Sequence, residues 1–421
     1  MLQISKIRDN KENYIALLKI KNIDAKQLII DVIKKDDERK SIQKKLDDLL
    51  ARGNQLNKQI GEIYKTGEID KADILKQESI EIKEESKVLQ IKKSEAEKEI
   101  RTILIRIPNI PHSSVPPGKL DSDNVKIKQV GKIPDLISEA KPHWDLVRDY
   151  SLINFDLGNK VTGAGFPVYI NKGAKLQRAL ITYFLDKNIE AGYVEYLPPH
   201  LVNETSGFST GQLPDKEGQM YHVTEENLYL APTAEVPVTN FFRDMIVGDL
   251  PVKCTAYTPC FRREAGSYGK EVRGLNRLHQ FDKVEIVQVA HPEKSYETLD
   301  GMVDHVASIL NELELPYKIV QLCGGDLSDS SALTFDFEVY SAGQKRWLEV
   351  SSVSNFESYQ ANRLKLRYKD DNGKTKLCHT LNGSALALPR VYAALIENNQ
   401  TEEGIKIPKV LIPYTGFDII Q

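Results

Sequence analysis

The chain has 421 residues, of which 41% are apolar and 28% are charged, and its formal net charge is −3. This length is about three times that of a typical single domain, so we expect two domains, with enough apolar residues for a sizeable core. The net charge excludes bulk attraction to nucleic acid, because a polyanion would have to be recognised by local patches. The first residues, MLQISKIRDN, contain no secretion-type apolar run, and no apolar stretch reaches the length of a membrane span. We therefore expect a cytoplasmic protein with no membrane contact.

Four cysteines are spread through the chain, with no CxxC pair and no histidines at zinc-finger spacing. A structural zinc site is not expected from this distribution, and neither is a disulfide framework in a chain of this size. Reduced thiols are the simplest interpretation.

Residues 26–107 differ from the rest of the chain, because they contain no Pro and only three Gly. Apolar residues recur there at alternating spacings of three and four, which is the coiled-coil pattern. The first half of the pattern contains Leu28, Val32, Ile42, Leu46, Leu49, Leu56, Ile60 and Ile63, and the second half contains Leu75, Ile82, Leu89, Ala96, Ile100, Ile103 and Ile107. Between the halves, YKTGEIDKAD predicts a turn at Gly67 and a helix cap at Asp70 or Asp73. We expect a hairpin of two antiparallel helices over about residues 28–107, each roughly 50 Å long.

Two interpretations of this hairpin remain open from its residues alone. It is either a dimerisation or tethering coil, or a probe that reaches a large ligand. Its 19 Lys and Arg against 17 Asp and Glu make it nearly neutral, so charge does not decide between them. Four prolines end the hairpin and form a stiff connector: Pro108, Pro111, Pro116 and Pro117. We place the domain boundary near residue 112.

The second part of the chain predicts an α+β domain. The segment GAKLQRALITYFLDKN has a helical apolar stripe at Leu176, Leu180, Tyr183 and Phe184. The extended candidates are YVEYLPPHLV, LYLAPTAEVPVTNFF, CTAYTPCFRRE, FDKVEIVQVA, YKIVQLCGG, TFDFEVY and RWLEVSSVSN. They follow one another closely without a regular helix between each pair, which favours a largely antiparallel sheet with helices outside. The nucleotide motifs of parallel sheets, GxxxxGK[ST] and GxGxxG, are missing.

Residues 261–285, FRREAGSYGKEVRGLNRLHQFDKVE, read as a long charged hairpin between two strand-like segments. Its loop contains Gly266, Gly269 and Gly274. Arg262 and Glu264 would share one face of the first strand, and Phe281 and Glu285 one face of the second. A guanidinium, carboxylates and an aromatic ring on one surface suit the phosphates, amine and base of a nucleotide. A solvated charged hairpin is the alternative.

Several segments, taken together and in order, resemble the seryl-tRNA synthetases of bacterial type. GYVEYLPPHLV is similar to motif 1 of class II aminoacyl-tRNA synthetases, FRREAGSYGKEVRGLNRLHQFDKVE to motif 2, and TLNGSALALPRVYAALIENNQ to motif 3. APTAE resembles the serine-binding segment of the family, LEVSS its nucleotide-binding segment, and the helical hairpin its tRNA-binding arm. The resemblance covers nearly the whole chain.

The resemblance implies a six-stranded antiparallel catalytic sheet over residues 113–421 and a tRNA-binding domain over residues 1–112. It implies a homodimer built on motif 1, with ATP as a substrate, Mg²⁺ as cofactor and no zinc. The implied reaction joins L-serine to serine tRNA through a seryl-adenylate, and to selenocysteine tRNA where that tRNA exists.

The resemblance also assigns the site residues. Serine is expected to contact Thr233, Ala234, Glu235, Arg262, Glu285, Asn382 and Ser384. ATP is expected to contact Arg262, Arg263, Glu264, Arg277, Phe281, Glu349, Val350, Ser351, Ser352 and Arg390. Mg²⁺ is expected at Glu349 and Ser352, and the catalytic residues are Arg262, Glu349 and Arg390.

The implied roles follow the chemistry of each side chain. Arg262 bridges the serine carboxylate and the α-phosphate, where it offsets charge that develops at phosphorus. Glu264 contacts the adenine amino group and Phe281 stacks on the base. Arg277 and Arg390 hold the outer phosphates.

Motif 3 departs from the family at two positions, with Ala385 and Pro389 where Gly is common. Pro is tolerated in the first turn of a helix, so Arg390 can still lie near a helix start. Three rival interpretations are weaker. An inactive paralogue should have lost Arg262, Glu264, Glu349 or Arg390; a synthetase for threonine should lack this arm and motif set; and a coiled-coil scaffold leaves residues 113–421 unexplained.

Overall fold

A computed structural model describes residues 1–66, 69–264 and 273–421. The described chain divides into two compact units, the first made of Met1–Lys19 and Ile23–Pro108 and the second of Ile20–Asn22 and Asn109–Gln421. No helix in these described ranges is long and apolar enough to cross a membrane. Gly266 and Gly269 of the predicted charged loop lie outside the described residues.

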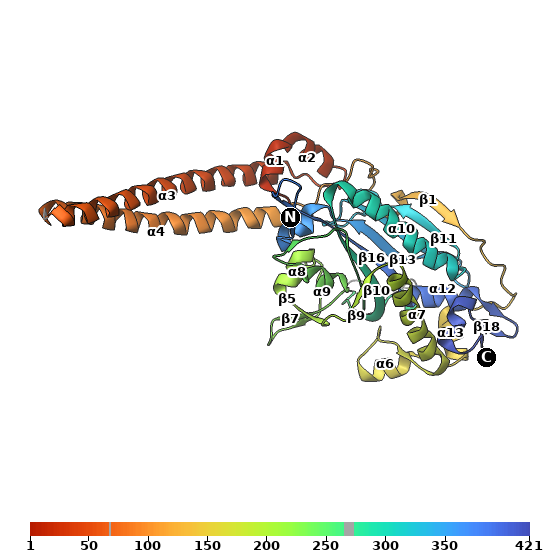
Figure 1. The fold of residues 1–421 in the computed structure, drawn as a ribbon. Helices are drawn as coiled ribbons and strands as arrows, with labels where there is room; N and C mark the ends of the chain where they lie inside the picture. Colours follow the sequence, from red (N-terminus) through yellow and green to blue (C-terminus); the bar gives the residue numbers. More distant parts are fainter. Residues whose placement is uncertain (67–68, 265–272) are drawn as a thin grey trace. The chain divides into compact units, whose positions relative to one another are not determined.

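The first unit is built on two long helices, α3 (Lys26–Thr66) and α4 (Ile69–Ile105), which lie side by side (Figure 1). Two short helices, α1 (Ile4–Asp9) and α2 (Lys11–Leu18), precede them. The predicted helical hairpin is confirmed, with helices of 41 and 37 residues. The predicted cap at Asp70 or Asp73 is wrong, because both residues lie inside α4.

The predicted apolar seam joins the two helices. Val32 and Leu56 are fully buried, as is most of Ala96. Gly53 interrupts the pattern where the helices come close, since a Cβ there would lie 3.4 Å from Ile82 Cγ2. Polar residues flank the seam as ion pairs across the hairpin: Lys35 with Glu99 at 2.6 Å, and Arg52 with Glu78 at 2.8 Å.

The second unit is built on a sheet whose eight strands, among the described residues, run in the order β1-β11-β12-β13-β16-β10-β9-β4. Their bounds are β1 (Val125–Val130), β11 (Tyr317–Gln321), β12 (Leu333–Ser341), β13 (Arg346–Asn355), β16 (His379–Ala387), β10 (Gln280–Ala290), β9 (Val252–Phe261) and β4 (Val194–Tyr196). Every neighbouring pair is antiparallel except β4 and β9. The predicted antiparallel α+β class is confirmed, and two edge strands, β1 and β4, extend the expected six.

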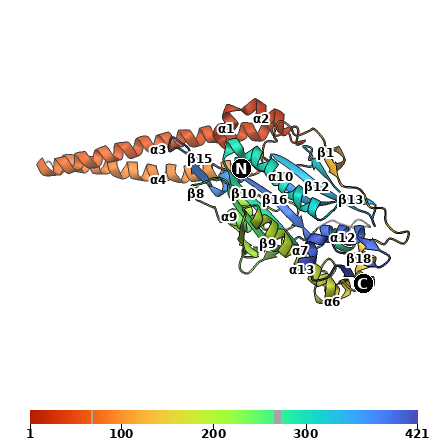
Figure 2. The ribbon, with the colours of Figure 1, turned by 45° about the vertical axis from the view of Figure 1, so that its right-hand side comes forward.

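Three helices cover one face of this sheet: α7 (Asn171–Glu190), α10 (Ser295–Glu312) and α12 (Leu388–Asn398) (Figure 2). The main core lies beneath them and includes Val284 and Ile286 of β10. The alternate residues Val287 and Val289 pack on the opposite face, in smaller clusters with α9 (Glu235–Asn240) and α11 (Ser358–Leu364). The side chain of Glu285 has the same parity as Val287, so β10 directs it toward this second face. Phe281 has that parity too, but near the start of β10 its ring also packs against the main core.

Shorter elements complete the unit. The remaining helices are α5 (His143–Asp149), α6 (Phe155–Val161), α8 (Glu204–Thr210) and α13 (Ile412–Thr415), with 3-10 turns η1 (Asp121–Asp123), η3 (Gly274–Asn276), η4 (Pro292–Lys294) and η5 (Lys409–Leu411). Small sheets are formed by β5 (Leu201–Asn203), β7 (Leu228–Leu230) and β6 (His222–Val223), by β15 (Thr375–Leu377), β14 (Arg367–Lys369) and β8 (Ile246–Val247), by β17 (Gln400–Thr401), β18 (Gly404–Lys406) and β19 (Ile419–Ile420), and by β2 (Ile153–Asn154) and β3 (Val168–Tyr169).

Two local predictions in this unit are wrong. The segment LYLAPTAEVPVTNFF is extended only as far as Leu230, and the helix α9 begins at Glu235. The strand β9 ends at Phe261, and Glu264 has a left-handed backbone with φ of +48°. Arg262 and Glu264 therefore do not alternate along one strand face.

Candidate active site

Arg262 lies directly after β9 and is held from two sides. Its backbone N–H donates to His279 O at 2.9 Å, which joins it to the returning strand. Its Nε donates to Pro232 O at 3.3 Å, and its guanidinium lies 5.3 Å from the centre of the Phe281 ring. The guanidinium thus stands between the Pro232–Glu235 segment and the aromatic ring predicted to stack on a base.

The residues predicted to bind serine gather around the Glu285 carboxylate. Glu285 pairs directly with Ser384 across β10 and β16. Its Oε1 accepts from Asn382 Nδ2 at 2.7 Å, and its Oε2 lies 3.5 Å from Ser384 Oγ. Lys283 Nζ lies 2.6 Å from Oε2, and both members of this ion pair are buried. The result is a buried polar cluster around the Glu285 carboxylate.

Thr233 and Ala234 directly precede α9, which begins at Glu235, and all three residues are buried. Thr233 Oγ1 accepts from the backbone N–H of Glu235 at 3.2 Å. The Glu235 carboxylate accepts from Gln360 Nε2 of α11 at 2.7 Å. Burial raises the pKa of the Glu235 carboxyl, and the nearby negative charge of Glu285 adds to this effect. The structure therefore brings together all the predicted serine contacts.

The predicted ATP contacts at the charged hairpin are also close to one another. Arg277 Nε forms an ion pair with Glu264 Oε2. The backbone of Arg263 is hydrogen-bonded to a distant segment, because its N–H donates to Gln219 O at 2.8 Å. Glu264 and Arg277 hold each other here, although they are predicted to contact opposite ends of ATP.

A bulge in β13 brings Glu349 and Ser352 to one face of the sheet. The pairing with β12 skips a residue, because Phe337 pairs with Ser351 and Glu338 pairs with Glu349. Val350 is the inserted residue, so the side-chain alternation shifts there. Ser352 Oγ consequently lies 3.4 Å from Glu349 Oε1.

Arg390 lies in the first turn of α12, behind Pro389, as predicted. Its Nη1 donates to Glu349 O at 2.8 Å, and its Nε donates to Asn276 O at 3.2 Å. Two backbone carbonyls therefore orient the guanidinium. Beside it, Ser351 Oγ donates to Ser384 O at 2.6 Å, which links this group to the pocket around Glu285.

The comparisons with known proteins agree with this geometry. Residues 221–399 match the family model of the tRNA synthetase class II core domain (G, H, P, S and T), and residues 1–111 match that of the seryl-tRNA synthetase N-terminal domain. The serine–tRNA ligase of Salinibacter ruber is 45% identical, with 99% of this chain and 98% of the relative aligned. That of Chlorobaculum parvum is 44% identical over the full length of both chains.

The chain belongs to the seryl-tRNA synthetase family. A solved seryl-tRNA synthetase from Pyrococcus horikoshii, complexed with ATP, has a similar fold, with a TM-score of 0.92 and 35% identity. The alignment covers 100% of this chain and 99% of that one.

Three polar residues of this seryl-tRNA synthetase site were missed from the sequence. The sequence could have indicated Lys283, because it lies two residues before Glu285 and therefore on the same strand face. It could not have indicated Gln360, because α11 comes from a distant part of the chain. Asp336 pairs with Ser352 across β12 and β13, and its buried Oδ1 has no hydrogen-bond partner among the described residues.

Burial raises the pKa of Glu235 to about 7, against an ordinary value of 4.5. The hydrogen bond from Gln360 opposes this effect, and the negative charge of Glu285 adds to it. Between these two pH values the folded chain binds the Glu235 proton more tightly than the unfolded chain does. The contribution of Glu235 to the free energy of unfolding therefore falls as the pH rises through this window.

We expect Glu235→Gln to stabilise the ligand-free seryl-tRNA synthetase fold more at high pH than at low pH. The gain over the parent should grow by up to about 3 kcal/mol between about pH 5 and about pH 8, because the neutral amide avoids ionisation in the buried pocket. Urea unfolding at both pH values measures the difference in free energy of unfolding between variant and parent. Glu225→Gln, at an exposed position, is the control. A gain that is the same at both pH values would contradict the assigned burial effect.

Proposed function

We propose that the protein is a serine–tRNA ligase, which uses ATP to join L-serine to serine tRNA through a seryl-adenylate. The observation that carries this proposal is the buried carboxylate of Glu285, with Asn382, Ser384 and Lys283 around it, next to Arg262. Such a pocket suits a small polar amino acid placed beside a nucleotide. In the first step a serine carboxylate oxygen attacks the α-phosphorus and pyrophosphate leaves. In the second, a ribose hydroxyl of the tRNA 3′ end attacks the carbonyl and AMP leaves.

Charge and hydrogen bonding suggest how serine lies in the pocket. The Glu235 carboxylate accepts from a neutral amide and lies near a second carboxylate, so it favours the substrate ammonium. The Glu285, Asn382 and Ser384 cluster offers donors and acceptors for the hydroxyl group. Arg262 would bind the substrate carboxylate and the α-phosphate together. The Arg262 guanidinium is held in place before ATP arrives, so it stabilises developing charge without reorganisation.

ATP would be bound by the second group of residues. Phe281 stacks on adenine and Glu264 accepts from its amino group, while Arg277 and Arg390 hold the outer phosphates. The Glu264–Arg277 ion pair must then open when ATP binds. Arg263, Val350 and Ser351 line this part of the site in the same proposal.

Mg²⁺ would be held by Glu349 and Ser352, with Asp336 as a further oxygen ligand. The unpartnered buried Oδ1 of Asp336 supports this fit, because Asp336 shares the sheet face of Ser352. Described residues offer no group of three or more His, Cys, Asp or Glu that could hold a metal, so the ATP phosphates would complete the shell. When bound, Mg²⁺ neutralises phosphate charge and orients the leaving pyrophosphate.

Serine is expected to be the only standard amino acid that drives strong ATP–pyrophosphate exchange. Alanine would leave the polar groups around Glu285 unpaired, a penalty that gives discrimination of about ten-thousandfold in comparable sites. Threonine carries an extra methyl group, and we expect the site to exclude it. Exchange is measured with each amino acid in turn. Equal exchange with threonine or proline would contradict the proposal.

The first 112 residues are proposed to bind tRNA, and residues 113–421 to perform the chemistry. Selenocysteine tRNA is a proposed second substrate where it exists, and the cytoplasm is the proposed location. We also propose a homodimer through motif 1, because the edge strand β4 and the residues after it expose Val194, Tyr196 and Leu197. Exposed apolar side chains on a sheet edge are typical of interfaces.

A further inference from the structure

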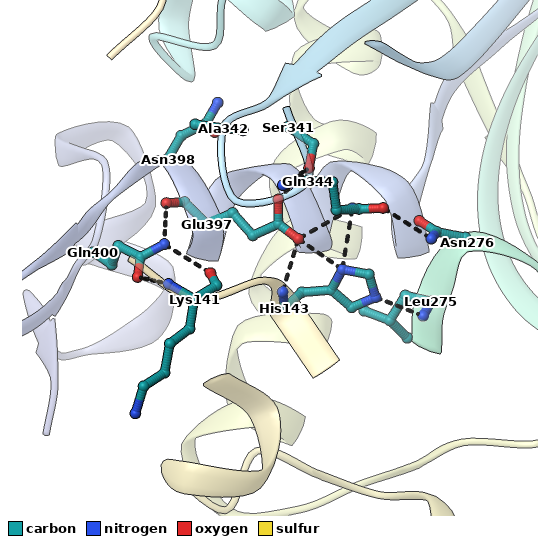
Figure 3. Close-up of polar contacts among 10 residues, drawn as sticks. All are labelled: Lys141, His143, Leu275, Asn276, Ser341, Ala342, Gln344, Glu397, Asn398 and Gln400. Carbon is teal, nitrogen blue, oxygen red and sulfur yellow. Dashed lines mark hydrogen bonds and ion pairs between the residues drawn. The ribbon is translucent and has the colours of Figure 1, made fainter. Parts of the chain in front are cut away.

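A buried polar cluster lies behind the phosphate side of the site and has no role so far. Its centre is a contact between His143, the first residue of α5, and Glu397 in the last turn of α12 (Figure 3). Both side chains are completely buried. Burying an ionisable pair is unfavourable unless its polar atoms are satisfied. The contacts of the pair with the rest of the chain are therefore informative.

The Glu397 carboxylate is surrounded by donors. Oε1 accepts from the backbone N–H of His143 at 2.7 Å and from Gln344 Nε2 at 3.1 Å, and it lies 2.7 Å from His143 Nδ1. Ser341 Oγ donates to Oε2. Among the described residues, these donors satisfy both oxygens of the carboxylate, so it acts as an anchor for the groups around it.

The imidazole of His143 links the Glu397 carboxylate to the returning end of the charged hairpin. Leu275 of η3 donates its backbone N–H to His143 Nε2 at 2.9 Å, so this nitrogen must be the acceptor. The ring proton is consequently on Nδ1, where it points to Glu397 Oε1. Glu397 thereby selects the imidazole tautomer that can hold the Leu275 amide, as carboxylates do for histidine elsewhere.

Two further contacts hold the same turn. Gly274 has φ of +67°, and a Cβ at this position would lie 2.3 Å from His143 Nε2, so only glycine permits the approach. The Arg273 guanidinium lies 4.9 Å from the centre of the Trp144 ring, the residue after His143. The start of α5 therefore fixes the hairpin where it returns to the sheet.

The fixed turn also orients Arg390, because Asn276 O accepts from Arg390 Nε at 3.2 Å. Asn276 Nδ2 donates to Gln344 Oε1 at 2.9 Å, and Gln344 Nε2 donates to Glu397 Oε1 (Figure 3). Arg390 and Glu397 are seven residues apart, or about two turns, so they lie on the same side of α12. The turn η3 is thus attached at two points along one helix.

We infer that the buried Glu397–His143 pair is a positioning element for ATP: it fixes the backbone of Leu275 and Asn276, and through the Asn276 carbonyl it orients the Arg390 guanidinium. This inference rests on the proposed function, in which Arg390 binds the outer phosphates. His143 and Glu397 are completely buried, so neither side chain is placed to contact a substrate. The pair should therefore affect ATP much more than serine.

Two substitutions of His143 separate positioning from plain stability. In His143→Gln the side-chain amide reaches the place of Nε2, so its oxygen can still accept from Leu275 while the Glu397 contact is lost. In His143→Asn the amide reaches the place of Nδ1, so it still donates to Glu397 while the Leu275 amide loses its acceptor. Stability alone favours the Asn variant, because a buried charged carboxylate that loses one of its donors is a more expensive defect than a neutral amide that loses its acceptor. Positioning favours the Gln variant.

The measurement is the KM for ATP and for serine in ATP–pyrophosphate exchange, together with the free energy of unfolding. We expect His143→Asn to raise the ATP KM by about tenfold, the effect of one lost buried hydrogen bond, and to leave the serine KM within about twofold. His143→Gln should keep the ATP KM within about threefold of the parent, although it is the less stable protein. The control is His305→Gln, at a partly buried histidine whose Nε2 contacts Asn188 at 2.7 Å on the α10 side of the sheet.

The inference is overturned if the ATP KM follows stability, with the Gln variant worse than the Asn variant, or if both folded variants keep the parental ATP KM. If neither His143 variant folds, Gln344→Met decides, because Gln344 is only partly buried and links Glu397 to Asn276. A rise in its ATP KM of about threefold or more supports the inference, and an unchanged KM overturns it. A parent chain without serine-dependent exchange would instead refute the proposed function.

Discussion

Replacing Arg262 with Ala is expected to slow serine-dependent ATP–pyrophosphate exchange by about a hundred- to a thousandfold. The guanidinium is held by Pro232 O on one side and lies over the Phe281 ring on the other, so it meets the reacting groups with little reorganisation. Loss of one preorganised contact to the developing charge removes roughly 3–4 kcal/mol of transition-state stabilisation. The α-phosphorus carries that charge in the proposed first step.

Two variants make the Arg262 result specific. Arg262→Lys keeps the charge but loses the planar fork that can contact carboxylate and phosphate together, so its activity should fall between the parent and the Ala variant. Arg148→Ala removes an exposed guanidinium outside the site and should be silent. Circular dichroism and thermal unfolding check that each variant is folded. A folded Arg262→Ala protein with activity within about threefold of the parent would rule out the assigned role.

The sequence predicted those parts of the fold in which apolar residues recur at regular spacing and are buried together. The seam of α3 and α4 was readable because Val32, Leu56 and Ala96 recur at coiled-coil spacing, and the same residues are buried. The stripe of Leu176, Leu180 and their neighbours likewise identified α7. The family resemblance then named side chains, such as Glu285 and Ser384, that the strand pairing of β10 and β16 brings together.

The remaining features depend on local backbone geometry or on distant contacts. No residue type around Val350 indicates a bulge, yet the bulge places Glu349 and Ser352 on the same face of the sheet. The left-handed conformation of Glu264 could not be read from a charged segment, because glycine is the residue expected there. The His143–Glu397 contact joins residues far apart in the chain, so no spacing rule could indicate it.

Shortening the helical arm is expected to separate the two steps of the reaction. The structure offers a precise place for the cut, since the Lys35–Glu99 ion pair marks one level of the hairpin near its base. Removing residues 43–92 and joining the ends with about six Gly and Ser residues spans the roughly 10 Å between packed helices. The shortened chain keeps that ion pair, and it also keeps the contact of Arg8 with Asp36 at 2.9 Å.

The shortened protein should activate serine at nearly the parental rate, because every proposed contact to ATP and serine lies after residue 232. Transfer of serine to tRNA should fall by about a hundredfold or more, because a bound but unpositioned acceptor end reacts slowly. The arm of the parent is nearly neutral, so its RNA contacts must come from exposed basic residues such as Lys44, Lys45 and Arg52, and tRNA binding should weaken as salt is raised. Exchange and aminoacylation are measured on the same purified sample. Loss of both activities would mean that the arm supports the catalytic fold, whereas retention of both would mean that it serves only as a tether.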